Sequence, residues 1–311
     1  MTLPESIGKL KKLQTLEFNY ITDLETLPQS IGNCQDLQSL QLNYCEKLRK
    51  IPSSVGRLRK LRVLHIIGCS SLQQLLLEFN GELSNLMTVN LHGCCGLQDL
   101  PTTLSCPKLR TLDLSETKVT VLPQWVISIC TLECLYLQNC EELLDLPKGI
   151  INLKNLEVLN LVGCSKLQCM PSGLRQLTRL RNLGSFAVGC GGDDARISEL
   201  ENLDMISGHM EITNLKYLKD PSEAEKAMLK RKNIWSLDLS WSSSQTKEEL
   251  VSDVEQDQCV LNALEPPSKI MFLKICGYRG PILPSWMVKQ NDSSCCAGIL
   301  FKQASLCPFF L

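Results

Sequence analysis

The chain has 311 residues, of which 44% are hydrophobic and 21% are charged, a balance typical of a globular protein with a large core. Its 32 basic and 33 acidic residues leave a net charge of −1, which argues against a surface for nucleic acid. No run of eighteen apolar residues predicts a membrane span, and the first residues lack the pattern of a secretory signal. We therefore expect a cytoplasmic chain, with the nucleus as the alternative compartment.

The 17 cysteines are numerous and odd in number. In a long, leucine-rich chain without a signal, reduced thiols are the better interpretation than a disulfide framework. No Cys-x-x-Cys pair occurs, and the sequence predicts no metal site and no cofactor.

A hydrophobic residue followed by proline recurs along the first half of the chain. The gaps between successive copies are 24, 24, 49, 22, 24 and 24 residues, starting from Leu3-Pro4. The gap of 49 hides one unit that opens near Leu75 and has lost its proline. Such self-similarity indicates a repeat architecture.

Each unit continues with the pattern L-x-x-L-x-L-x-x-C-x-x-L. Leu37, Leu40, Leu42, Cys45 and Leu48 fill one copy, and Thr117 replaces the cysteine in the fifth. The L-x-L core has period two and predicts a short strand with one buried face. Because a unit of two dozen residues cannot hold itself together, the units must stack. The sequence predicts an α/β solenoid with a parallel concave sheet, and Pro and Gly favour short helical turns on the convex side.

The regular units end near residue 183. Residues 184–287 are less regular: Ser198 and Glu201 suggest a capping box, residues 208–218 alternate as a strand, and residues 221–232 suggest a capped helix. Further strands are expected at 234–239 and 270–275, separated by a polar loop at 242–258. Residues 288–311 show no repeat and receive no assignment.

Several phrases resemble a known family. Leu27-Pro-Gln-Ser-Ile-Gly, Gly208-His-Met-Glu-Ile-Thr-Asn-Leu and Leu237-Asp-Leu-Ser-Trp are similar to the leucine-rich repeats of plant intracellular immune receptors, in the order seen in their coiled-coil subclass. The resemblance covers residues 1–287 and implies a leucine-rich-repeat horseshoe that senses pathogen effectors or modified host proteins and holds a nucleotide-binding domain inactive. No G-x-x-x-x-G-K-[S/T] motif occurs, so we expect either a fragment or a truncated gene product without that domain.

Outward positions beside the core leucines predict the partner-binding surface, because aromatic and arginine side chains on an open sheet are common binding anchors. A solvated face without a partner is the alternative. The predicted binding residues are Gln41, Tyr44, Arg62, His65, Asn90, His92, Arg110, Asp113, Glu133, Tyr136, Trp235, Asp238 and Trp241.

Basic residues recur just before the first leucine of several strands. They predict either a solvated edge or a docking edge for an acidic partner domain. This basic edge comprises Lys12, Arg59, Lys60, Lys108, Lys154 and Arg179.

No nucleophile, base and orienting group occur at suggestive spacing, so we expect no enzyme. Two other functions stay open. A scaffold of the Ras-associated type shares the L-P-x-S-[I/V]-G units, but the irregular residues 189–286 argue against it. A substrate adaptor of a ubiquitin ligase would need an F-box, which the first residues do not contain.

Overall fold

The computed structural model describes residues 1–75, 83–192, 194–241, 254–288 and 298–302. The chain divides into two compact units, Met1–Leu167 (unit 1) and Gln168–Leu311 (unit 2). The division lies earlier than residue 183, where the sequence pattern loosens. No helix among the described residues is long and apolar enough to cross a membrane.

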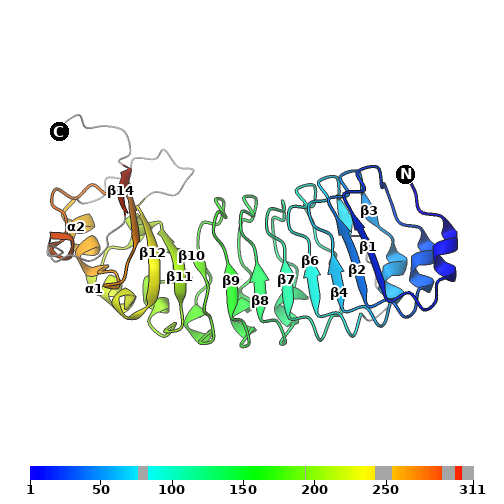
Figure 1. Ribbon diagram of the computed structural model, residues 1–311. Coiled ribbons are helices and arrows are strands. Elements are labelled where there is room, and N and C mark those ends of the chain that lie inside the picture. Colours follow the sequence, from blue (N-terminus) through cyan, green and yellow to red (C-terminus); the bar gives the residue numbers. More distant parts are fainter. Residues whose placement is uncertain (76–82, 193, 242–253, 289–297, 303–311) are drawn as a thin grey trace. The chain divides into compact units, whose positions relative to one another are not determined.

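Unit 1 is built around a parallel sheet of one strand per repeat (Figure 1). Each strand falls on an L-x-L core, as the sequence predicts, and the core leucines stand opposite one another, as in the register of Leu16 with Leu40 and of Leu40 with Leu64. The strands are β1 (Thr15–Asn19), β2 (Ser39–Asn43), β4 (Val63–His65), β6 (Thr88–Asn90), β7 (Thr111–Asp113), β8 (Cys134–Tyr136) and β9 (Val158–Asn160).

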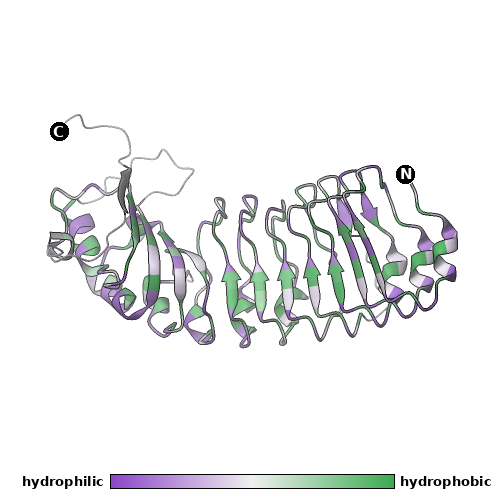
Figure 2. Cartoon of the chain, viewed as in Figure 1, coloured by the Kyte–Doolittle hydropathy of each residue, from purple (hydrophilic) through white to green (hydrophobic). Residues whose placement is uncertain are grey.

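The core of unit 1 lies behind this sheet. Leu40, Leu42 and Leu64 have no exposed surface, whereas Gln41 and His65, which follow Leu40 and Leu64 in their strands, are partly exposed. Each fully buried aliphatic side chain stabilises the fold by about 1.5–3 kcal/mol. In Figure 2, hydrophobic residues occur in the strands and also recur at intervals along the connecting segments.

In the first three repeats, the return segment starts with the proline that opens the repeat. Pro4, Pro28 and Pro52 adopt extended backbone immediately before a short 3-10 helix. Gly32 permits close contact between neighbouring helices, because a methyl group there would meet the Ser54 carbonyl oxygen at 2.4 Å. The helices of unit 1 are η1 (Glu5–Lys9), η2 (Gln29–Asn33), η3 (Ser53–Arg57), η4 (Val126–Ser128) and η5 (Lys148–Asn152).

The unit without a proline is confirmed by a second, two-stranded sheet. There β3 (Lys50–Ile51) pairs with β5 (Gln74–Leu75), so Leu75 stands opposite Ile51. Residues 76–82 lie outside the described residues.

The cysteine column packs the turn that follows each strand. The Cys69 thiol donates to the Leu42 carbonyl oxygen at 3.2 Å, and the Cys94 thiol donates to that of Ile66 at 2.9 Å, in each case in the preceding coil. Thr117 fills the same slot and donates to the Leu114 carbonyl oxygen at 2.7 Å. Burial raises the pKa of Cys69 and of Cys94 to about 12, so both thiols stay protonated at neutral pH. These contacts give the column a packing role between neighbouring coils of unit 1.

Unit 2 contains a separate parallel sheet (Figure 1). Its strands are β10 (Gly184–Ala187), β11 (Ser207–Thr213), β12 (Asn233–Ser240), β13 (Phe272–Cys276) and β14 (Gly298–Lys302). The expected strands at 234–239 and 270–275 are confirmed as β12 and β13 within small shifts of their ends. Strand β14 was not foreseen, because residues 288–311 carry no recognisable repeat.

Short helices occupy the segments between the strands of unit 2. They are η6 (Leu174–Gln176), η7 (Ile197–Leu200), η8 (Leu215–Tyr217), α1 (Pro221–Lys226), η9 (Leu229–Arg231), α2 (Val254–Ala263) and α3 (Ser285–Val288). Their ends correct several sequence-based expectations.

The predicted capping box is wrong, because η7 begins at Ile197 without a side-chain cap. Strand β11 stops at Thr213, since Asn214 has a left-handed backbone with φ of 62°. The helix expected at 221–232 ends at Lys226, because Met228, the residue before η9, has a left-handed backbone with φ of 51°. Of the polar loop expected at 242–258, residues 254–258 are helical and 242–253 lie outside the described residues.

Candidate protein-binding surface

One face of the unit 1 sheet carries a continuous row of polar side chains. We call it the central row; each member stands opposite the next on the neighbouring strand, and those on β2 to β9 are partly exposed. Its members are Glu17, Gln41, His65, Asn90, Asp113, Tyr136 and Asn160. The parallel register therefore brings five of the predicted binding residues together: Gln41, His65, Asn90, Asp113 and Tyr136.

Two members of the central row also stabilise their own strands. The Asn90 side-chain oxygen accepts the His92 amide at 2.9 Å, and an Asp113 carboxylate oxygen accepts the Ser115 amide at 2.9 Å. These bonds hold the side-chain oxygens of Asn90 and Asp113 close to the backbone just beyond the ends of β6 and β7.

His65 and Tyr136 are neutral on this face at pH 7. Burial lowers the pKa of His65, although the Asp113 carboxylate opposes this shift. Burial also raises the pKa of Tyr136, and the neighbouring Cys134 adds to the effect. The middle of the central row is thus a hydrogen-bonding surface with one carboxylate, at Asp113.

A second row flanks the central row at the start of the strands, and successive members are joined by backbone hydrogen bonds. It contains the predicted residues Arg62, Arg110 and Glu133, with Met87 between the two arginines. Arg110 Nη1 lies 2.8 Å from Glu133 Oε1, so these two side chains pair with each other. Arg62 and Met87 are exposed.

The predicted residue Tyr44 lies just beyond strand β2. It is 43% exposed and stacks on Tyr20, with ring centroids 4.9 Å apart. Sequence reasoning included Tyr44 and missed Tyr20, because the first repeat is the least regular.

In unit 2, Trp235 is positioned by a β-bulge. The register between β11 and β12 passes from Gly208 opposite Ile234 to His209 opposite Ser236, which leaves Trp235 as the extra residue. Its side chain is 46% exposed and meets Phe272 edge to face at 6.2 Å. Bulges re-aim side chains in this way, and no repeat pattern could have located this one.

Asp238 lies on β12 and pairs with Lys274 of β13, whose Nζ is 2.9 Å from Oδ2. Sequence reasoning missed Lys274. Trp241 is a correction: it is only 3% exposed and packs against Tyr278, with ring centroids 5.3 Å apart. It is a core residue and not part of an exposed surface.

The predicted basic edge is exposed but partly engaged within unit 1. Lys60 Nζ lies 2.6 Å from Asp36 in the preceding coil, and Lys108 Nζ donates to Asn85 Oδ1 at 2.9 Å. Lys12, Arg59 and Lys154 are also exposed. Arg179 belongs to unit 2, so it is not placed relative to the others.

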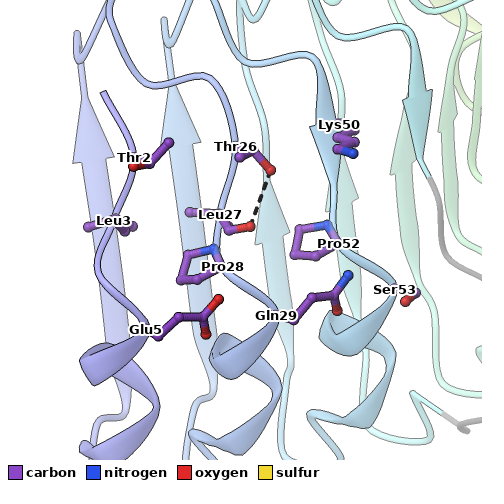
Figure 3. A pocket seen from close by; sticks show the side chains of 10 residues that line it. All are labelled: Thr2, Leu3, Glu5, Thr26, Leu27, Pro28, Gln29, Lys50, Pro52 and Ser53. Atoms are coloured by element: carbon purple, nitrogen blue, oxygen red, sulfur yellow. Dashed lines mark hydrogen bonds between the residues drawn. The ribbon is translucent and has the colours of Figure 1, made fainter.

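A hollow of about 550 Å³ lies along the proline segments of the first repeats (Figure 3). Its lining combines aliphatic, hydroxyl and charged groups, including Leu3, Glu5 and Lys50. Glu5 is already engaged, because its carboxylate accepts the Ser30 amide at 3.1 Å. No cluster of metal-ligating side chains lies in the part of the chain that the structure describes.

Two family models match the chain. Residues 2–181 match the model described as "Disease resistance protein RPS4B-like, leucine-rich repeats", and residues 197–303 match the model described as "R13L1/DRL21 LRRs". The second match includes β14 and ends at residue 303, so the family pattern extends into residues 288–311, which show no repeat in the sequence.

Similar proteins point the same way. The chain is 43% identical over 206 residues to the putative disease resistance protein At3g14460 of Arabidopsis thaliana, which covers 64% of this chain and 14% of that protein. It is 38% identical over 112 residues to disease resistance protein RGA2 of Solanum bulbocastanum, covering 36% of this chain and 11% of that protein. The matched region is thus a small part of each relative's length.

Among solved structures, the Leptospira interrogans LRR protein LIC12759 superposes with a TM-score of 0.58 at 24% identity, covering 96% of this chain and 80% of that one. This likeness concerns the fold, and it agrees with a leucine-rich-repeat solenoid of parallel strands and short helices.

Proposed function

Because the chain belongs to the leucine-rich-repeat family of plant disease-resistance proteins, we propose that it is the protein-recognition and autoregulatory module of an intracellular plant immune receptor. The module binds a pathogen effector or a modified host protein in the cytoplasm or nucleus. Binding biases a two-state switch in the receptor's nucleotide-binding domain. Leucine-rich-repeat domains generally serve as protein-interaction scaffolds rather than as catalysts, which fits this role.

The central row is the observation that carries this proposal. Gln41, His65 and Tyr136 occupy equivalent register positions on β2, β4 and β8 of one parallel sheet, with partly exposed side chains. Repeats of this kind recognise partners through an extended sheet surface. A surface of amide, imidazole and phenol groups can satisfy many hydrogen bonds with a folded protein while avoiding the desolvation of several charges.

The basic edge supports a second contact, with the receptor's own nucleotide-binding domain. Arg59 and Lys60 are exposed next to one another, and the Lys60 ion pair with Asp36 is exposed enough to exchange for another carboxylate. We propose that an acidic surface of that domain docks here in the inactive state.

The recognition proposal is tested with the full receptor that carries these repeats, expressed in leaves and challenged with pathogen isolates. Gln41→Arg and Tyr136→Arg place a charge in the central row and should abolish the isolate-specific defence response. Arg57→Glu on η3 is the matched control and should leave the response unchanged. Immunoblots must show equal accumulation of all variants. A normal response from both central-row variants would contradict the proposal.

The docking proposal is tested separately by measuring binding of this chain to the nucleotide-binding domain of the same receptor. Arg59→Glu with Lys60→Glu should weaken binding about tenfold or more, because close charge reversal costs more than 1.4 kcal/mol. The control is again Arg57→Glu. Unchanged binding of the double variant would refute the basic edge as a docking site.

A further inference from the structure

One position after each strand of unit 1 has a left-handed backbone. These positions recur every 23 to 25 residues along the sequence. The set comprises Tyr20, Tyr44, Gly68, Gly93, Glu116, Asn139 and Gly163, with φ between 55° and 78°. Glycine and asparagine suit this conformation, whereas a bulky aromatic residue there is an outlier. Two adjacent coils nevertheless carry tyrosine.

The two tyrosines form a parallel stack that lies on the surface. Their ring planes differ by 4° and their centroids are 4.9 Å apart. The Tyr44 ring lies over Gly68, because a methyl group at Gly68 would come within 2.5 Å of the Tyr44 Cδ1 atom. Tyr20 and Tyr44 are still 70% and 43% exposed. The stack therefore adds little to the core, although its backbone is unfavourable for tyrosine. Such retained strain suggests a role in binding.

Gly68 and Gly93 leave the next two coils without a side chain at this position. A third ring of the chain therefore does not continue the stack beyond Tyr44. Ile67 and His92, which precede these glycines, are only partly exposed. The Tyr44 ring itself fills the space above Gly68, so Tyr20 is the more exposed ring of the pair.

The charges nearest to the stack in sequence are negative. Glu17 on β1 accepts the Asn19 amide group at 2.6 Å, which holds its carboxylate toward the strand end that leads to Tyr20. Glu46 follows Tyr44 by two residues and is exposed. The cation of the same turn, Lys47, is paired with Asp23 at 2.6 Å. Exposed carboxylates and electron-rich ring faces both favour a cation.

We propose that the Tyr20–Tyr44 stack binds an arginine side chain of the partner protein. The planar guanidinium stacks on the exposed surface of the tyrosine pair, and its N–H groups face the Glu17 and Glu46 carboxylates. Arginine fits better than lysine, because only the guanidinium combines a flat face with several donors in one plane. This inference rests on the proposed recognition function for its biological meaning, and it adds the chemistry of one anchor.

The test uses the whole chain with ¹³C-labelled tyrosine, because only five tyrosines are present and each gives its own signal. The probes are the capped tripeptides Gly-Arg-Gly, Gly-Lys-Gly, Gly-Gln-Gly and Gly-Phe-Gly. We expect saturable shifts at Tyr20 and Tyr44 with the arginine peptide, about two- to fivefold tighter than with the lysine peptide. Tyr217 and Tyr278 of unit 2 are internal controls and should not shift.

Variants distinguish the contribution of the Tyr44 ring from that of the Glu46 carboxylate. Tyr44→Leu should abolish the shift at Tyr20, Tyr44→Phe should keep it, and Glu46→Gln should weaken it about two- to threefold. Equal shifts with the glutamine peptide, tighter binding of the phenylalanine peptide, or no shift at all would each overturn the arginine assignment. Those outcomes leave the recognition proposal standing, because the leaf assay tests it with variants of the central row.

Discussion

The two units use the same strand signature to build different surfaces. In unit 1, β4, β6, β7, β8 and β9 are each three residues long. Each is followed by a left-handed residue and then by the position that holds cysteine in most repeats. In unit 2, β11 and β12 reach seven and eight residues, and helices α1 and α2 are inserted between strands. Strict repetition gives unit 1 an in-register polar row, whereas irregularity gives unit 2 a bulge that exposes Trp235.

The difference extends to how neighbouring coils are joined. In unit 1 the same cysteine contact recurs, as in Cys69 to Leu42 and Cys94 to Ile66. In unit 2 individual polar groups join the coils, such as the buried Lys232, whose ammonium group donates to the Leu200 and Leu203 carbonyl oxygens at 2.7 and 3.1 Å. Unit 1 thus joins neighbouring coils through the same cysteine contact repeated along the chain, whereas unit 2 uses contacts that are specific to one coil.

The largest effect is expected from the buried leucines at the core of each unit. Leu64→Ala in β4 should lower the free energy of unfolding by about 2–5 kcal/mol, because Leu64 is fully buried. Leu237→Ala in β12 should cost a similar amount. Denaturant titration followed by circular dichroism measures both, with Val63→Ala on the half-exposed face as the control. A cost below 1 kcal/mol at either leucine would contradict its assignment to the core of its unit.

The buried Lys232 of unit 2 should make the stability of the fold depend on pH. Burial lowers its pKa to about 8 in the folded chain, against 10.5 when exposed, and the Asp204 carboxylate opposes the shift. Between these values only the unfolded chain holds the proton, so folding should become more favourable as pH rises from 8 to 10.5, by at most about 3 kcal/mol.

The comparison is Lys232→Met, which should show no such rise and should cost about 1–3 kcal/mol at pH 7 by leaving two carbonyls without a donor. Lys230→Met, at an exposed ion pair with Glu265, is the matched control. If wild type and Lys232→Met respond to pH in parallel, the buried ammonium is not the cause.

The cysteine column predicts a smaller cost within unit 1. Cys94→Ala removes the thiol that donates to Ile66 and leaves a small void, which should cost about 1–2 kcal/mol. Cys95→Ala, one residue later and exposed, should change stability by less than about 0.5 kcal/mol. Equal effects of the two substitutions in thermal unfolding would show that the column does not join the coils.

The smallest effect is expected at the paired charges beside the central row. The side chains of Arg110 and Glu133 are 55% and 39% exposed, so solvent screens their interaction. Arg110→Ala should cost less than about 1 kcal/mol, and a double-mutant cycle with Glu133→Ala isolates the pair. A coupling above 2 kcal/mol would mean that this pair is structural and not available to a partner.

Much of unit 1 follows from the sequence, because one physical constraint repeats. The L-x-L spacing places a strand in every coil, and its register then aligns Gln41, His65 and Tyr136 without further information. The sequence also places Leu75 at the start of a unit although its proline is lost. Periodicity predicts the positions of the strands well where every coil packs its leucines in the same way.

Several features of unit 2 cannot be predicted from the repeat pattern. The bulge at Trp235 depends on pairing with the neighbouring strand, and the left-handed backbone of Met228 has no local signature in the sequence. Trp241 occupies a position equivalent to the exposed Tyr44, yet packing against Tyr278 buries it. Hydrogen-bond partners such as Lys274 for Asp238 also depend on pairing between distant segments.

The claim that the open face of the unit 1 sheet is the recognition surface is tested most directly by substituting every residue of β1 to β9 and scoring each variant twice. One score is protein accumulation and the other is the pathogen-triggered response of the receptor that carries these repeats. We expect core positions such as Leu64 to lose accumulation, and positions of the central row such as Gln41 and Tyr136 to lose only the response. Central-row variants that accumulate and respond as well as the wild type would contradict the account.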